Sequence, residues 1–232
     1  EHNQAGRLKA RFFYPPPGRM AHTGRSRKET PMAKPMLNEE IRRQAQEILS
    51  DMELPVEIVY FGQESGCEYC AETLQLLQEV ADLSDRIHLQ VHDLHNEADL
   101  AREYNMDKAP GFVLATRKGK EIVDYGIRYA GIPVGHEFTS LINDLLLVSK
   151  QDSSLSEETR QFLRGLDTPV HLQVFVTPTC AFCPRMVVLA HQFALESPLV
   201  QAEMVEALEF RELSDQYGVT GVPHISINHG LH

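Results

Sequence analysis

The sequence has no tryptophan, and none of its apolar stretches reaches the roughly 18 residues that a membrane-spanning helix needs. Its first residues also lack the apolar segment of a secretory signal peptide. Hydrophobic residues nevertheless make up 42% of the 232 residues, which is enough for a packed core. These features predict a globular cytoplasmic protein that has no membrane partner.

Basic residues are scarce and unevenly placed. The chain holds 22 Lys and Arg against 33 Asp and Glu, for a net charge of −11. Residues 1–35 carry eight basic and two acidic residues, so the remainder carries 14 basic and 31 acidic ones. Such an acidic body argues against nucleic acid as a partner, because phosphate contacts need clustered Lys and Arg. Residues 1–35 also hold five prolines without an apolar period, which predicts a disordered basic extension, with an organelle transit peptide as the alternative.

Cysteine is rare too, and its four residues form two C-x-x-C pairs. "GCEYC" contains Cys67 and Cys70, and "TPTCAFCP" contains Cys180 and Cys183. An offset of 113 residues relates the two pairs, and it also matches Leu76 with Leu189, Leu100 with Leu213, Tyr104 with Tyr217 and Pro110 with Pro223. Internal repetition of this kind indicates two copies of one fold.

Apolar patterning predicts alternating helices and strands in each copy. A helix should follow the N-cap residue Asn38, a strand should cover residues 56–61, another helix should follow Cys70, and a closing helix should cover residues 135–149. The second copy repeats this order from the N-cap residue Ser156. The alternation predicts an α/β fold in which each copy has a mixed central sheet flanked by helices.

The repeat sets the expected domain boundaries. We expect unit one at residues 36–150 and unit two at residues 151–232, joined near residues 149–155. Unit two has only nine residues after Pro223, so we expect it to lack the last strand and closing helix of unit one. An uncovered strand edge should make unit two the less stable of the two.

Both cysteine pairs fall where a strand should pass into a helix. Cysteines three residues apart in a first helical turn lie within disulfide range. The helix N-terminus favours a thiolate on the first cysteine, and the second, expected one turn inside the helix, can attack a mixed disulfide. The prolines of "DKAPGFV" and "TGVPHIS" each precede a strand, where a cis peptide bond could border an extended client strand. The arrangement favours an enzyme that makes, breaks or exchanges disulfides.

With these motifs in hand, each unit resembles a thioredoxin or glutaredoxin fold. Residues 37–232 resemble the tandem protein disulfide oxidoreductases, also called glutaredoxin-like proteins, through "GCEYC" with "APGF" and "TPTCAFCP" with "GVPHI". The resemblance implies client proteins with thiols or disulfides as substrates, and a flavin-dependent thioredoxin reductase as electron source. It implies no cofactor or metal besides the redox-active disulfides.

The resemblance also implies a role for each motif residue. By position, these are Cys67 and Cys180 as nucleophiles, Cys70 and Cys183 as resolving thiols, Pro110 and Pro223 as cis-prolines, and Ala109 and Val222 as the residues that pair with a substrate strand. Thioredoxin has a buried acid in the strand before its cysteines. The matching positions here are Tyr60 and Val174, so that proton acceptor is expected to be missing.

Other uses of these residues remain open. The four cysteines could bind structural zinc, although Cys70 and Cys180 are 110 residues apart and zinc ribbons space their pairs by about 15 to 20. A second metal site could form at His88, His92 and His95, where a solvated polar face is favoured. Within the thioredoxin fold, the alternatives are a glutathione-dependent glutaredoxin and a redox-inert peptide-binding module.

The charges beside the two cysteine pairs differ. Glu64 and Glu68 flank Cys67, whereas Arg185 lies in the first turn after Cys180. Negative charge disfavours a thiolate and positive charge favours it. We therefore expect the second pair to form the more oxidising disulfide.

Overall fold

The computed structural model describes residues 34–119 and 121–230, so nearly all of the expected extension at residues 1–35 lies outside the described residues. Within the described part, helices and strands follow one another in this order: α1 (Glu39–Leu49), β1 (Val56–Gly62), α2 (Cys70–Ala81), β2 (Ile87–Asp93), α3 (Ala98–Glu103), β3 (Gly111–Lys118), β4 (Glu121–Ala130), α4 (Glu137–Lys150), α5 (Glu157–Arg164), β5 (Val170–Val176), α6 (Cys183–Glu196), β6 (Val200–Glu206), α7 (Arg211–Gln216) and β7 (His224–Ile227).

The predicted N-caps begin their helices as expected. The Asn38 side chain accepts a hydrogen bond from the backbone nitrogen of Ile41, and that of Ser156 accepts one from Thr159. Each cap satisfies a backbone N–H group that has no partner within the helix, a contribution of about 1 kcal/mol. The first helix of each unit therefore begins with the same kind of side-chain N-cap, as the repeat predicts.

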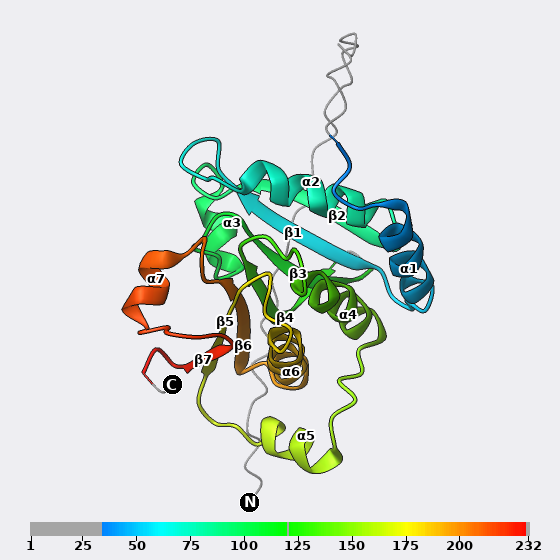
Figure 1. Cartoon of the computed structure of the whole chain (residues 1–232). Coiled ribbons are helices and arrows are strands. Elements are labelled where there is room, and N and C mark those ends of the chain that lie inside the picture. Colours follow the sequence, from blue (N-terminus) through cyan, green and yellow to red (C-terminus); the bar gives the residue numbers. More distant parts are fainter. Residues whose placement is uncertain (1–33, 120, 231–232) are drawn as a thin grey trace, which may run out of the picture.

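All seven strands form one sheet, in the order β2-β1-β3-β4-β6-β5-β7 (Figure 1). The mixed α/β architecture is as predicted, and the strands of the two units join edge to edge, because β4 of unit one pairs in parallel with β6 of unit two, from Ile127 beside Ala202 to Ala130 beside Val205. Each of these strands would otherwise present a row of unpaired backbone groups at a sheet edge, and the pairing satisfies both rows.

The repeat is visible in the strand order. Strands β2-β1-β3 of unit one correspond to β6-β5-β7 of unit two, and the same parallel and antiparallel pairings recur. In unit one, β4 continues the sheet beyond β3, whereas β7 is the edge of the sheet in unit two. Within the described residues, no strand of unit two corresponds to β4.

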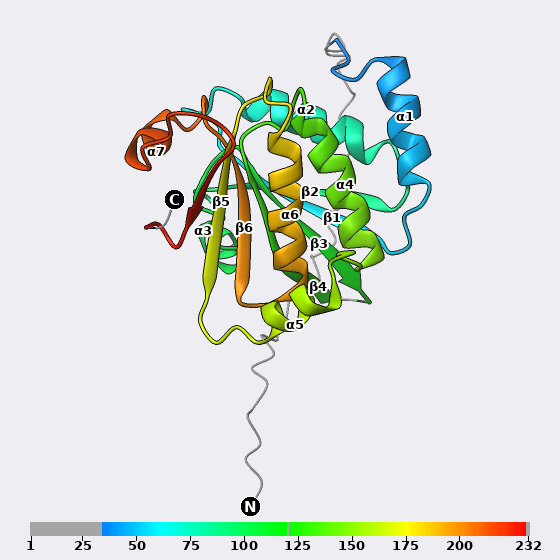
Figure 2. The same ribbon diagram turned by 60° about the horizontal axis from the view of Figure 1, so that its bottom comes forward.

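Helices cover both faces of the sheet. Helices α1, α2, α4, α5 and α6 share the large hydrophobic core on one face, where α4 and α6 lie side by side (Figure 2). Helix α3 packs on the opposite face over unit one, and the segment around α7 does so over unit two. None of the helices in the described ranges is long and apolar enough to cross a bilayer.

Candidate active site

Each C-x-x-C pair lies at a strand–helix junction and forms a disulfide. Cys67–Cys70 follows β1 and Cys180–Cys183 follows β5, with a Cα–Cα distance of 5.5 Å in both. The helices begin at Cys70 and Cys183 themselves. The second cysteine is therefore in the first helical position rather than one turn inside the helix, and the first cysteine precedes the helix.

The two cysteines of each pair differ in exposure. Cys70 and Cys183 are buried, at 8% and 0% relative exposure, whereas Cys67 and Cys180 are half-buried. The first sulfur of each pair is thus the one that a partner protein can reach. This fits the nucleophile and resolving roles, which remain predictions.

Both predicted prolines follow cis peptide bonds, Ala109–Pro110 and Val222–Pro223. The strand register brings each beside its cysteine pair, because Gly111 lies opposite Phe61 at the end of β1, and His224 lies opposite Phe175 near the end of β5. We call Cys67, Cys70, Ala109 and Pro110 site one, and Cys180, Cys183, Val222 and Pro223 site two. The pairing of a substrate strand with Ala109 and Val222 remains a prediction.

The two sites open on the same edge of the sheet. Strands β1 and β5 run in the same direction, and β3, β4 and β6 lie between them. Four strand spacings of about 4.8 Å separate their ends by roughly 20 Å. The structure therefore does not bring the two cysteine pairs together, but it places the C-terminal ends of β4 and β6 between them.

Tyrosine and valine occupy the strand positions where thioredoxin has an acid. Tyr60 and Val174 are both buried, and the Tyr60 hydroxyl donates a hydrogen bond to the carbonyl oxygen of Cys70 at 2.8 Å. Burial raises the pKa of Tyr60 to about 12. This tyrosine therefore stays neutral and acts as a hydrogen-bond donor at site one.

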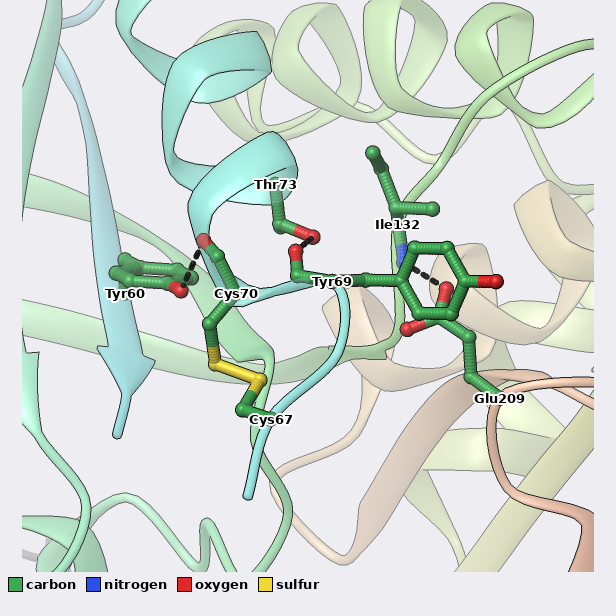
Figure 3. Close-up of a disulfide and its surroundings, with 7 residues drawn as sticks. All are labelled: Tyr60, Cys67, Tyr69, Cys70, Thr73, Ile132 and Glu209. Carbon is green, nitrogen blue, oxygen red and sulfur yellow. Dashed lines mark hydrogen bonds between the residues drawn. A yellow bond between two sulfur atoms is a disulfide. The ribbon is translucent and has the colours of Figure 1, made fainter. Parts of the chain in front are cut away.

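Segments that contact each site nevertheless bring a carboxyl group of the neighbouring unit close to it. At site one, the Glu209 carboxyl of unit two accepts a hydrogen bond from the backbone nitrogen of Ile132 at 2.7 Å (Figure 3). Burial raises the pKa of Glu209 to about 7. Glu206 lies next to it, and burial raises the pKa of that carboxyl as well.

At site two, the buried acid comes from unit one. The backbone nitrogen of His136 donates to the carbonyl oxygen of Pro178, which fastens the start of α4 to the segment before Cys180. A Cβ on Gly135 would lie 2.3 Å from that oxygen, so only glycine allows this approach. Glu137 follows at 1% exposure, and burial raises the pKa of its carboxyl to about 7.

A buried polar network continues from Glu137 along the contact between α4 and α6. Glu137 accepts a hydrogen bond from Ser140, and Asp144 contacts both His191 Nδ1, at 2.6 Å, and the Tyr129 hydroxyl. The second oxygens of Glu137 and Asp144 are buried without a hydrogen-bond partner. Glu137 and Glu209 were not among the sequence-predicted site residues, because each lies in a different unit from the neighbouring cysteine pair and no local spacing links the two.

The described residues contain no group of three or more His, Cys, Asp or Glu that could hold a metal ion. Of the three histidines considered for such a site, His92 Nδ1 pairs with Glu97 at 2.8 Å, and its ring packs near Phe61.

Known proteins that are similar to this chain in sequence or structure also have a thioredoxin-type fold. Residues 170–231 match the family model described as "Thioredoxin domain". Over 83% of its length, the chain superposes on 84% of a protein disulfide oxidoreductase from Aeropyrum pernix K1, with a TM-score of 0.76 and 32% sequence identity. The chain belongs to the family of thioredoxin-fold disulfide oxidoreductases.

Two further relatives are similar to the chain over the same share of its length. The NTD_N/C domain of alkylhydroperoxide reductase AhpF from Enterococcus faecalis is 29% identical, with a TM-score of 0.76 over 83% of this chain and 91% of that one. The alkyl hydroperoxide reductase AhpF of Staphylococcus epidermidis is 30% identical over 193 residues. The chain spans only about a third of that relative, 34% of its length.

Proposed function

We propose that this disulfide oxidoreductase exchanges thiols and disulfides with client proteins in the cytoplasm, using both C-x-x-C sites. The observation that carries the proposal is the repeated arrangement of a half-buried first cysteine, a buried second cysteine and a neighbouring cis-proline strand. The half-buried first thiol can react with a client, while the buried second thiol stays protected until a mixed disulfide has formed.

The exchange proceeds in two steps, written for site two. The Cys180 thiolate attacks one sulfur of a client disulfide, which forms a mixed disulfide and releases the other client sulfur as a thiolate that takes up a proton. Cys183 then loses its proton and attacks Cys180, which forms the Cys180–Cys183 disulfide and releases the second client thiol. Two electrons pass from the enzyme to the client, and the reverse order oxidises a client.

Local contacts support these roles at site two. The backbone nitrogen of Cys183 donates a hydrogen bond to the Cys180 sulfur at 3.1 Å, in a geometry that would also stabilise a thiolate. A flavin-dependent thioredoxin reductase would return the electrons to the disulfide. The same two steps apply at site one with Cys67 and Cys70.

The surface beside the cysteines suits protein clients. Tyr69 and Phe182, each within a C-x-x-C motif, are 38% and 73% exposed, and Leu208 between the sites is 56% exposed. A groove of about 430 Å³ beside site two is lined by Val222, and Leu208 also lines it. Exposed apolar side chains near a groove are typical of interaction surfaces, so these residues would contact the client chain.

Insulin reduction by dithiothreitol tests this proposal. The chain should accelerate the reduction of insulin disulfides, and a variant with all four cysteines changed to serine should not. A redox-inert peptide-binding module would give no acceleration in either form. A glutaredoxin would require glutathione and would prefer small glutathione mixed disulfides, which a parallel assay with such a substrate detects.

The match to the alkyl hydroperoxide reductase AhpF favours a second candidate function. In that case the two sites would pass electrons onward within a hydroperoxide-reducing system. Adding the reduced chain to the other components of such a reductase should then speed the consumption of an alkyl hydroperoxide. The cysteine-free variant should have no effect.

A further inference from the structure

The Glu209 side chain reaches from unit two to the backbone that follows β4 of unit one. Its Oε1 accepts a hydrogen bond from the backbone nitrogen of Ile132, and the preceding residue, Gly131, donates from its own nitrogen to the carbonyl oxygen of Pro110 at 2.9 Å. The carboxyl is therefore tied, through two adjacent backbone groups, to the cis-proline segment of site one. Figure 3 shows the Glu209 carboxyl next to Ile132 and the ring of Tyr69, the residue before Cys70 of the site-one disulfide.

The local backbone leaves room for this carboxyl. Gly131 has a φ of +100°, and a Cβ there would lie 2.6 Å from the Glu206 Cβ and 3.0 Å from Glu209 Oε1. A side chain at this position would push the acids away. The second carboxyl oxygen of Glu209 is buried and has no hydrogen-bond partner, which disfavours a permanent negative charge there.

The groups that face Glu209 are mostly acidic or neutral. Glu206 and Glu68 raise the pKa of its carboxyl beyond the effect of burial, while the hydrogen bond from Ile132 lowers it. Burial raises the pKa of Tyr60 and Glu68 raises that of Tyr69, and the Glu209 charge adds to both shifts. The groove lined by Glu68 and Glu209 also holds the cations Lys108 and Arg211. Lys108 is paired with Asp107 and Glu203, and the exposed Arg211 acts on Glu206.

We propose that Glu209 is a positioning residue through which unit two controls the thiolate of Cys67. The inference rests on the proposed function, because it concerns the reduced state of site one. An ionised Glu209 places a second negative charge beside the Cys67 thiolate and opposes its formation. A protonated Glu209 removes that opposition and keeps its contact with the backbone.

Reduction of site one is then coupled to proton uptake by Glu209. A dithiol such as dithiothreitol supplies two electrons, the Cys67–Cys70 bond breaks, and the sulfurs become a Cys67 thiolate and a Cys70 thiol. One proton goes to Cys70 and a second goes to Glu209 instead of solvent. Because this uptake occurs only where Glu209 is otherwise ionised, the potential of site one should fall more steeply with rising pH around neutrality.

Alkylation of a chain with a single cysteine tests the inference. In the full chain with Cys70, Cys180 and Cys183 changed to serine, iodoacetamide rates report the Cys67 thiolate from pH 5 to 9. Glu209→Gln removes the charge but keeps an oxygen that can accept from Ile132. We expect a lower apparent pKa for Cys67 and an alkylation rate at pH 7.5 that is about threefold higher or more.

Two controls separate a local effect from a general change in charge. Glu158→Gln makes the same change on the exposed start of α5, the helix that precedes β5, and should leave the profile unchanged. In a chain that keeps only Cys180, Glu209→Gln should alter the rate less than it does for Cys67. Equal profiles for Glu209→Gln and its parent, or equal shifts in either control, would overturn the proposal.

A second measurement covers the case in which Glu209→Gln does not fold, which its thermal unfolding curve will show. The profile of the Cys67-only chain with Glu209 intact should need two ionisations, and a profile that fits one ionisation contradicts the proposal. None of these alkylation rates depends on catalysis with a client protein. If the chain fails to reduce insulin but Glu209→Gln still shifts the Cys67 profile, the proposed function is wrong and the coupling between Glu209 and Cys67 stands.

Discussion

Sites one and two share their disulfide geometry and strand register but differ in the charges around them. Glu68, Glu206 and Glu209 gather on the site-one side, whereas site two has Phe182 within its motif and Arg185 in the first turn of α6. The two copies of the repeat have the same backbone arrangement at their sites. The charges around each site differ, because some of the charged side chains there come from the other unit.

The two units join through different strands, and this explains why different charged groups surround the two sites. The β4 edge of unit one meets the β6 edge of unit two, so unit one contributes Glu137 on α4 while unit two contributes Glu209 after β6. Glu137 is 1% exposed and belongs to a polar network with Asp144 and His191, whereas Glu209 is only partly buried. The two acids therefore should respond differently to pH and to substitution.

The largest expected effect concerns trapping of clients. Cys183→Ser should accumulate a stable mixed disulfide with a client through Cys180, because no second thiol remains to release it. Cys180→Ser should trap little, since Cys183 is fully buried. Non-reducing gels measure this after the reduced variant is incubated with a partly unfolded client protein that carries disulfides, so that Cys180 attacks a client disulfide and releases the other client sulfur as a thiol. Equal trapping by both variants would contradict the assigned roles, and the same asymmetry should hold for Cys70→Ser over Cys67→Ser.

Stability against pH should distinguish the two buried acids. Because its pKa is about 7 in the folded chain, Glu137 keeps its proton while the unfolded chain loses it near the usual value of 4.5. Stability should therefore fall as pH rises from about 4.5 to about 7, by roughly 2 to 3 kcal/mol from this group. Glu137→Gln should remove most of that fall in urea unfolding at pH 5, 6 and 7.

The exposed acid Glu158 offers the matched control, since Glu158→Gln should leave the pH dependence unchanged. Glu209→Gln should remove a smaller share than Glu137→Gln, because Glu209 is less enclosed. An unchanged pH dependence in Glu137→Gln would show that another group carries the proton.

A smaller expected effect is a difference in alkylation rate between the first cysteines of the two sites, Cys67 and Cys180. With Cys70→Ser in one variant and Cys183→Ser in the other, and the remaining site mutated to serine, Cys180 should be alkylated about tenfold faster than Cys67 at pH 6. The acids around site one disfavour its thiolate, whereas the Cys183 N–H group and Arg185 favour that of Cys180. Equal rates, or a faster Cys67, would contradict the charge argument.

The smallest effect concerns unequal stability within unit two. Because β6 and β5 belong to the sheet of unit one, limited proteolysis should first remove the segment after β6, with α7 and the edge strand β7. Hydrogen exchange should likewise be faster in β7 than in β5 or β6. A resistant fragment that stops near residue 150 would instead support separable units, as the sequence alone predicts.

Local and repeated features could be predicted from the sequence. The caps at Asn38 and Ser156, the C-x-x-C junctions and the prolines beside them follow from short motifs that occur twice. The continuous sheet could not be predicted, because no sequence motif within either repeat indicates that β4 pairs with β6. The acids were missed for the same reason, since Glu209 and Ile132 meet across 77 residues of sequence.

A redox titration of each site tests the central account most directly. Two full-length variants, one with Cys67 and Cys70 changed to serine and the other with Cys180 and Cys183 changed, are equilibrated in dithiothreitol or glutathione buffers at pH 7. The oxidised fraction is read by thiol labelling and mass spectrometry. The account predicts two reversible two-electron transitions, with site two higher by roughly 30 mV or more, which is tenfold in the exchange constant. Coincident potentials, a higher potential at site one, or no reversible transition would contradict it.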